Sequence, residues 1–168
     1  MPLARMEDLP DSSRTWVFGS DRALSGDASR ILLEHVDRFL AQWRAHGAPL
    51  TAARDWRYDR FLTIAVDQST EGASGCSIDG LFRALKALEP RLGASLVTSG
   101  LIFFRDTGGT IQSVDRDRFS VVGAEGRISP DTGVFDPTVT TLGEWRVRFE
   151  LRLADSWHAG LVHYGQPV

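Results

Sequence analysis

Residues 60–67 read RFLTIAVD, a nearly continuous apolar run that predicts a strand buried on both faces. The preceding residues 50–58 alternate weakly between apolar and polar, and their aromatic residues Trp56 and Tyr58 favour a second strand. Only the tripeptide 58–60 separates the two apolar segments, so we expect them to form a β-hairpin.

Two amphipathic segments flank this hairpin and predict two long helices. The first runs from about Asp27 to His46 with apolar residues at helical spacing, and Gly47 directly after it is a typical helix stop. The second runs from Ser77 to Leu92 and carries a stripe of leucines.

Two further strands complete the predicted core. Residues 15–19 are short, aromatic and β-branched, and residues 101–105 are apolar and end at a turn. The order β-α-β-β-α-β is that of the ferredoxin-like split β-α-β fold, with two helices on one face of a four-stranded antiparallel sheet. We therefore predict one α+β domain over residues 1–168, with this core at about 15–106 and a C-terminal α/β extension at about 107–168.

The first and fourth predicted strands are apolar on both faces, so we expect the C-terminal segment or a second subunit to cover the face opposite the helices. In that segment, residues 115–123 predict a short helix and residues 134–135 a short strand. Residues 145–153 fit a helix, through a capping box at 141–144, but also alternate like a strand. We expect a helix first and extended chain after about Glu150.

The composition is that of an ordinary globular protein, with 42% hydrophobic and 24% charged residues among 168. The net charge of −3 and the absence of a Lys/Arg block predict no nucleic-acid partner. No apolar stretch has the length of a membrane-spanning helix or a signal peptide. The single cysteine, Cys76, excludes an intramolecular disulfide, so we expect a cytoplasmic protein without a membrane partner.

Motifs of several common enzyme classes are missing from the sequence. It contains no phosphate-binding G-x-x-x-x-G-K-[ST] loop and no dinucleotide-binding G-x-G-x-x-G. It also lacks H-E-x-x-H, G-x-S-x-G and paired C-x-x-C motifs. We accordingly expect no cofactor and no metal.

The segment SGCSID, residues 74–79, is the strongest candidate for a functional site. It leads from a buried strand into a helix, and free N–H groups at a helix start bind anions. The candidate ligand-binding residues are Ser74, Gly75, Ser77 and Asp79. Cys76 is a candidate nucleophile, because a thiol at a helix start can have a lowered pKa. In the simpler alternative, Ser77 caps the helix, Gly75 makes the turn and Cys76 is a buried filler.

His46 and His158 are the candidate catalytic bases. His46 ends the first predicted helix, where the helix dipole favours the protonated imidazole. His158 follows Asp155 in an Asp-x-x-His arrangement that can orient a base or contribute to a metal site. No His, Asp and Glu spacing in the chain requires a metal.

Several stretches of the chain resemble an uncharacterised family of small bacterial proteins; they are residues 16–21, 43–47, 60–67, 73–79 and 155–158. Residues 74–79 are the most distinctive of them. Members of that family are often labelled transporter ATPases, but no nucleotide-binding motif supports that label here. The resemblance implies a bacterial, cytosolic protein and supplies no activity or catalytic residue.

Three functions fit these residues. The first is a small-molecule or anion-binding domain with its site at residues 74–79 and a small anionic ligand as its partner. The second is a protein-interaction or homodimerisation module without chemistry, which would bury the second face of the sheet. The third is a thiol-dependent enzyme or redox sensor that uses Cys76 with another protein or a small thiol.

Overall fold

The computed structural model describes residues 3–163. The chain forms two compact units: unit 1 combines the chain up to Thr98 with Pro137–Arg146, and unit 2 combines Ser99–Asp136 with the chain from Val147 onward. Each unit contains helices and an antiparallel sheet, so the predicted α+β class is confirmed. The prediction of a single domain stays a prediction.

The sheet of unit 1 contains β1 (Arg14–Gly19), β4 (Thr51–Arg57) and β5 (Phe61–Asp67) in the order β1-β5-β4. Both pairings are antiparallel, which makes β1 and β4 parallel to each other with β5 between them. This is the arrangement of a split β-α-β unit. The predicted hairpin of β4 and β5 is confirmed.

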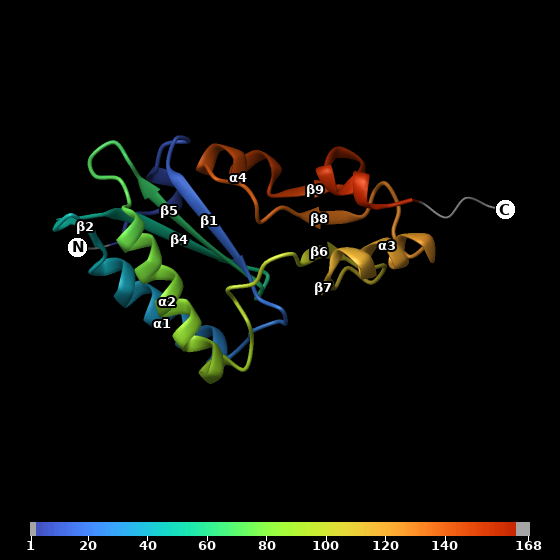
Figure 1. Cartoon of the computed structure of the whole chain (residues 1–168), viewed down its shortest axis with the longest axis horizontal. Coiled ribbons are helices and arrows are strands. Elements are labelled where there is room, and N and C mark those ends of the chain that lie inside the picture. The colour runs from blue at the N-terminus through green and yellow to red at the C-terminus, as the bar shows by residue number, and fades with distance from the viewer. Residues whose placement is uncertain (1–2, 164–168) are drawn as a thin grey trace. The chain divides into compact units, whose positions relative to one another are not determined.

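Helices α1 (Asp27–Ala41) and α2 (Gly75–Leu92) cover one face of this sheet (Figure 1). Their leucines pack against the side chains that β5 directs to that face, Leu62, Ile64 and Val66. Gly93 ends α2 in the left-handed conformation, with a φ of 67°, which glycine adopts without steric cost.

The segment Pro137–Arg146 belongs to unit 1 and contacts β1 and β4. Thr141 bridges to Arg14 of β1, and α4 (Leu142–Arg148) begins directly afterwards. The Arg57 guanidinium carbon lies 4.7 Å from the ring centre of Trp145. The expectation that C-terminal sequence covers the face opposite the helices stays a prediction.

The predicted fourth strand exists but belongs to another sheet. In unit 2, β6 (Ile102–Arg105) pairs with β7 (Ile111–Val114) and β8 (Gly133–Phe135), and β9 (Glu150–Arg152) completes the order β7-β6-β8-β9. The sheet of unit 1 therefore has three strands, and the four-stranded ferredoxin-like core is not confirmed. Strand β7 was not predicted from the sequence; its pairing with β6 closes only a short loop and so costs little entropy.

The first long helix ends at Ala41, five residues before the predicted end at His46. The chain turns there because Trp43 is buried and its Nε1 donates a hydrogen bond to the Ser77 carbonyl at 2.8 Å. The short strands β2 (Arg44–Ala45) and β3 (Ala48–Pro49) follow as a hairpin. His46 and Gly47 form its turn with φ of 51° and 80°, which is typical of tight hairpin turns.

The remaining helices of unit 2 are α3 (Arg116–Ala124) and the 3-10 helices η2 (Leu153–Asp155) and η3 (Trp157–Leu161); a further 3-10 helix, η1 (Met6–Asp8), lies in unit 1. Phe104, Phe119 and Leu153 lie at the centre of the core of unit 2. The predicted helix at 115–123 is confirmed, as is the change from helix to extended chain near Glu150.

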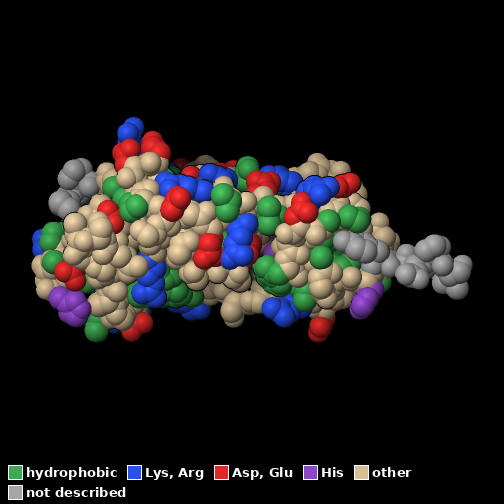
Figure 2. Space-filling view, turned by 90° about the horizontal axis from the view of Figure 1, so that it is seen from above, with side chains coloured by type: hydrophobic (Ala, Val, Ile, Leu, Met, Phe, Trp, Pro, Cys, Tyr) green, Lys and Arg blue, Asp and Glu red, His purple; other side chains and the backbone are tan. Residues whose placement is uncertain are grey.

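The surface seen in Figure 2 carries acidic and basic side chains interspersed, without a large area of one sign. Among the described residues, the helices are too short or too polar to cross a membrane.

The first prediction concerns Gly123 in α3, where a Cβ atom would lie 2.4 Å from Val162 Cγ1. Gly123→Ala should lower the free energy of unfolding by about 1–3 kcal/mol, because overpacking a core has that cost. Urea denaturation measures the effect. Gly160→Ala is the control, because a Cβ there meets no atom within 4 Å. The double variant Gly123→Ala/Val162→Ala should recover part of the loss, and an unchanged midpoint for Gly123→Ala would contradict the packing.

Candidate functional site

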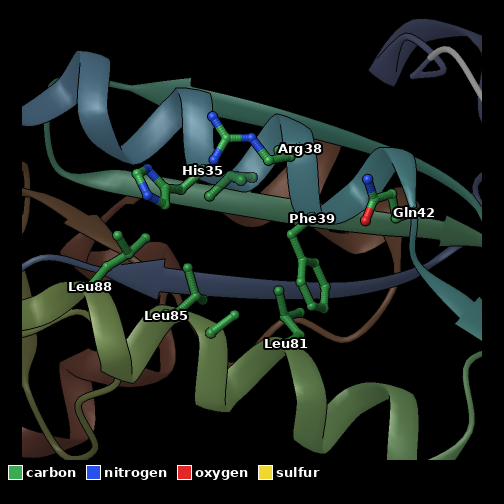
Figure 3. A pocket seen from close by; sticks show the side chains of 9 residues that line it. His35, Arg38, Phe39, Gln42, Leu81, Leu85 and Leu88 are labelled. Carbon is green, nitrogen blue, oxygen red and sulfur yellow. The ribbon is translucent and has the colours of Figure 1, made fainter.

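A cavity of about 250 Å³ lies between α1 and α2 on the outer side of unit 1 (Figure 3). Its lining consists of His35, Val36, Arg38, Phe39, Gln42, Leu81, Ala84, Leu85 and Leu88. Most of these side chains are apolar, and Figure 3 shows the Phe39 ring and the leucines pointing into the space between the helices. We call this cavity the interhelical cleft.

The cleft follows from the local sequence of the two helices. On α1 and its C-cap Gln42, residues 35, 38, 39 and 42 recur at the spacing that places side chains on one helical face. On α2, residues 81, 84, 85 and 88 do the same. Ala84 is the smallest residue in the second set, so the helices are held by Leu81 and Leu85, both buried, while space remains beside Ala84.

Two nitrogen contacts fix the imidazole of His35 at the edge of the cleft. Its Nδ1 lies 2.9 Å from the Ile31 carbonyl oxygen, which can only accept, so Nδ1 carries the proton and donates. Its Nε2 lies 3.1 Å from Arg91 Nη1, which can only donate, so Nε2 accepts. His35 is thereby held as one neutral tautomer that links α1 to the end of α2.

The charge around the cleft is positive. Arg38 lines it and makes no ion pair with any described residue, and no acidic residue is part of the lining. The nearest acids in sequence are already engaged: Asp37 accepts two hydrogen bonds from Arg54, at 2.7 and 2.9 Å. Glu34 pairs with Arg30 at 3.3 Å. Arg38 therefore presents one guanidinium group to whatever enters the cleft, and Arg91 reaches only the ring of His35 at its edge.

The sequence-predicted site at residues 74–79 forms the start of α2 and is occupied by a capping box. The Ser77 N–H donates to Ser74 Oγ at 3.1 Å, and the Ser74 N–H donates to Ser77 Oγ at 2.7 Å. The Ser77 hydroxyl donates to the Ser74 carbonyl at 2.8 Å. Gly75 and Asp79 are exposed. The two serines thus bind each other, as expected for a helix start.

The simpler alternative is wrong in its details. Ser74 instead of Ser77 is the N-cap of α2, and Gly75 is the first helical residue. Cys76 is exposed and not buried. Within the described residues, Cys76 makes no hydrogen bond and no ion pair that would activate a thiol. His46 is also exposed, at the turn of the β2–β3 hairpin instead of at a helix end. Cys76 belongs to unit 1 and His158 to unit 2.

His158 is fully buried in unit 2, with its ring stacked on Trp157 at a centroid distance of 3.9 Å. Nδ1 contacts Ser156 Oγ, while Nε2 has no hydrogen-bond partner among the described residues. Burial lowers the pKa of His158 to about 4, more than the nearby Asp136 carboxylate raises it. The imidazole is therefore a neutral packing group at neutral pH.

The predicted Asp155 and His158 pair does not form, because Asp155 accepts a hydrogen bond from Arg152 Nε at 3.0 Å. The described part of the chain contains no group of three side chains that could hold a metal ion.

The residues of the cleft were not predicted from the sequence, although the helical pattern contains a signal for them. The helical stripes place His35 and Arg38 beside apolar positions, and a small residue, Ala84, interrupts the stripe of leucines on α2. However, the cleft brings together residues of α1 and α2 that are about fifty positions apart in the chain.

The sequence matches no family model, and no curated protein or solved structure shows significant similarity to it. The family resemblance drawn from the sequence therefore stays a prediction.

The second prediction concerns pH and His158. In the unfolded chain His158 has its usual pKa of 6.5 and becomes protonated below that pH. In the folded chain its pKa is about 4, so it becomes protonated only near pH 4. The contribution of His158 to the free energy of unfolding is therefore fully present above pH 6.5. It is lost as the pH falls to about 4, which lowers the free energy of unfolding by up to roughly 3 kcal/mol. Urea denaturation across this range measures the slope.

His158→Gln should flatten that slope, whereas His46→Gln, at an exposed position, should leave it unchanged. Equal slopes for the wild type and His158→Gln would show that His158 is not held neutral by burial.

The third prediction concerns the exposure of Cys76. A neutral alkylating agent such as iodoacetamide should modify Cys76 in the native protein without prior unfolding, because the side chain is exposed. Mass spectrometry follows the reaction, with protein in urea as the control. Modification that waits for unfolding would contradict the exposed position of Cys76 at the start of α2.

Proposed function

We propose that this protein binds a small amphipathic anion in the interhelical cleft. The apolar part of the ligand would lie among Phe39, Leu81 and Leu85, and the anionic group would meet Arg38 at the edge. The observation that carries the proposal is an apolar cavity with an unpaired arginine in its lining and no acid. The class of function is that predicted from the sequence, a small-molecule or anion-binding domain, but the site differs.

The size of the cleft limits the ligand. Pockets for drug-sized molecules have volumes of roughly 300–1,000 Å³, and the cleft, at about 250 Å³, is slightly smaller. A single ring or a short alkyl chain suits this space. Burial of such a group is favourable by about 25 cal/mol per Å² of apolar surface removed from water.

The polar edge supports an anion over a neutral or cationic head group. The guanidinium of Arg38 offers a planar set of donors that matches carboxylate or phosphate oxygens. Arg91 is outside the lining and donates to His35, so Arg38 is the cation that a ligand in the cleft would meet. A cationic head group would meet Arg38 without a compensating acid in the lining.

The lining residues favour binding over catalysis. Among them only His35 carries an imidazole, and both of its ring nitrogens are engaged in contacts with Ile31 and Arg91. The lining contains no serine, cysteine or carboxylate that would act as a nucleophile or as a second acid or base. A thiol enzyme based on Cys76 has less support, because no base contacts the thiol within the described residues.

The fourth prediction tests this function with linear carboxylates from hexanoate to dodecanoate. One chain length should raise the melting temperature most, and a ligand at 100 times its Kd stabilises a fold by about 2.7 kcal/mol. The alcohol of the same chain length should bind more weakly because it lacks the charge. Thermal denaturation and titration calorimetry measure both effects.

Two variants locate the binding site. Ala84→Phe should fill the cleft and abolish the stabilisation, because residue 84 is partly exposed and lines the cavity. Arg38→Gln should weaken the binding of the carboxylate roughly fivefold, because one exposed ion pair is lost. It should leave the affinity for the alcohol unchanged. The matched control is Arg83→Gln, an exposed arginine of α2 outside the cleft.

Cys76 alkylation separates this site from the one first predicted at the start of α2. A carboxylate in the cleft should leave the alkylation rate unchanged, whereas an anion on the Gly75 and Cys76 N–H groups should slow it. Failure of every chain length to stabilise the protein, or equal stabilisation of Ala84→Phe, would refute the proposal.

A further inference from the structure

Strand β1 has one paired edge and one open edge. On its paired side it meets β5, with Trp16 opposite Ile64 and Val17 opposite Thr63. The Thr15 N–H donates to the Thr140 carbonyl at 2.9 Å, so it points away from β5. Backbone groups alternate in direction along an antiparallel strand, so those of Val17 and Gly19 point the same way as those of Thr15.

The open edge of β1 has hydrogen-bond partners at its two ends and none among the described residues at its centre. Thr140 occupies the N-terminal end, and Thr98 Oγ1 donates to the Gly19 carbonyl at 3.5 Å at the other. Between them, the N–H and C=O of Val17 make no hydrogen bond with any described residue. A strand with such unused groups is a template for another extended chain.

A groove of about 300 Å³ runs along this edge. Its lining, all in unit 1, consists of residues 14–18, Phe82, Val97, Thr98 and residues 137–140. Phe82 of α2 is partly exposed and contacts Phe18, with ring centres 5.2 Å apart. The groove therefore combines backbone hydrogen-bonding groups with apolar surface, as peptide-binding sheet edges do.

Arg14 is the only ionisable residue of this lining. Its guanidinium carbon lies 5.0 Å from the Trp16 ring centre, and it makes no ion pair with the described residues. A strand added antiparallel to β1 would run towards this arginine and end beside it. A free C-terminal carboxylate at that end would meet a positive charge and no acid.

We propose that the open edge of β1 binds the C-terminal segment of another polypeptide, as an added antiparallel strand. The ligand's backbone pairs with the N–H and C=O of Val17, an apolar side chain packs on Phe82, and the terminal carboxylate pairs with Arg14. This site is separate from the interhelical cleft and does not depend on the function proposed for it.

A second copy of this chain fits the edge less well than a peptide. Symmetric pairing of two β1 strands about Val17 would place Gly19 of one copy opposite Thr15 of the other. Thr15 is already bonded to Thr140, so the incoming strand would meet residues 137–140. A short peptide that ends before Thr15 avoids this collision.

The fifth prediction is that a random octapeptide library with free C-termini, labelled with fluorescein at the N-terminus, contains binders of the full chain. Binding is measured by fluorescence polarisation. The selected peptides should lose roughly fivefold in affinity when the C-terminus is amidated, because one exposed ion pair is removed. Arg14→Gln should cause a similar loss, and amidation should then have no further effect.

Val17→Pro removes the outward N–H without breaking the ladder to β5, because proline is tolerated at an edge position whose N–H faces away from the sheet. It should abolish binding, whereas the control Val17→Ala should retain it. If Val17→Pro does not fold, a peptide N-methylated at the amide that faces the Val17 carbonyl replaces it and should fail to bind the wild type.

Amide hydrogen exchange gives a direct measurement of the edge. In the free protein the Val17 N–H should exchange faster than those of Trp16 and Phe18, which face β5. Saturating peptide should slow the Val17 amide. No binders in the library, or an unchanged Val17 amide in the complex, would overturn the proposal. The proposal would also be overturned if the Val17 amide were protected from exchange without peptide and sedimentation showed a dimer, because the edge would then bind a second copy of this chain.

Discussion

The burial of β5 between two other strands is the constraint on which the rest of unit 1 depends. Every side chain from Phe61 to Val66 is at most 1% exposed. Both edges of β5 are paired, with β1 on one side and β4 on the other. Its even-numbered side chains form the surface on which α1 and α2 pack, and its odd-numbered ones face the opposite side. Loss of this strand would remove the support of both helices.

Both proposed sites arise where that packing is incomplete. The helices share the surface of β5, but the small side chain of Ala84 leaves a cavity between them. Strand β1 uses β5 as its only full partner, so its second edge remains open beyond Thr15. In each case an unpaired arginine lies beside the unfilled space, Arg38 in the cleft and Arg14 at the sheet edge.

The serines at the start of α2 show that one sequence feature is compatible with two different structures. Serines before a helix suit an anion site and suit a helix cap equally well, because both use the same oxygen and N–H groups. Here Ser74 and Ser77 satisfy each other's backbone N–H groups. What the sequence could not show is which partner each hydroxyl takes, since the alternatives differ only by a rotation of side chains.

The sequence by itself determined the features that rest on local periodicity and turn chemistry. These are the hairpin of β4 and β5, the helix predicted at 77–92 and observed at 75–92, and the change from helix to strand near Glu150. Only the tertiary structure decided the pairing of β6 with β8 and the contact of His35 with Arg91, which lies 56 residues away. Such pairings depend on the competition between distant segments for the same surface, and no local pattern records which of them wins.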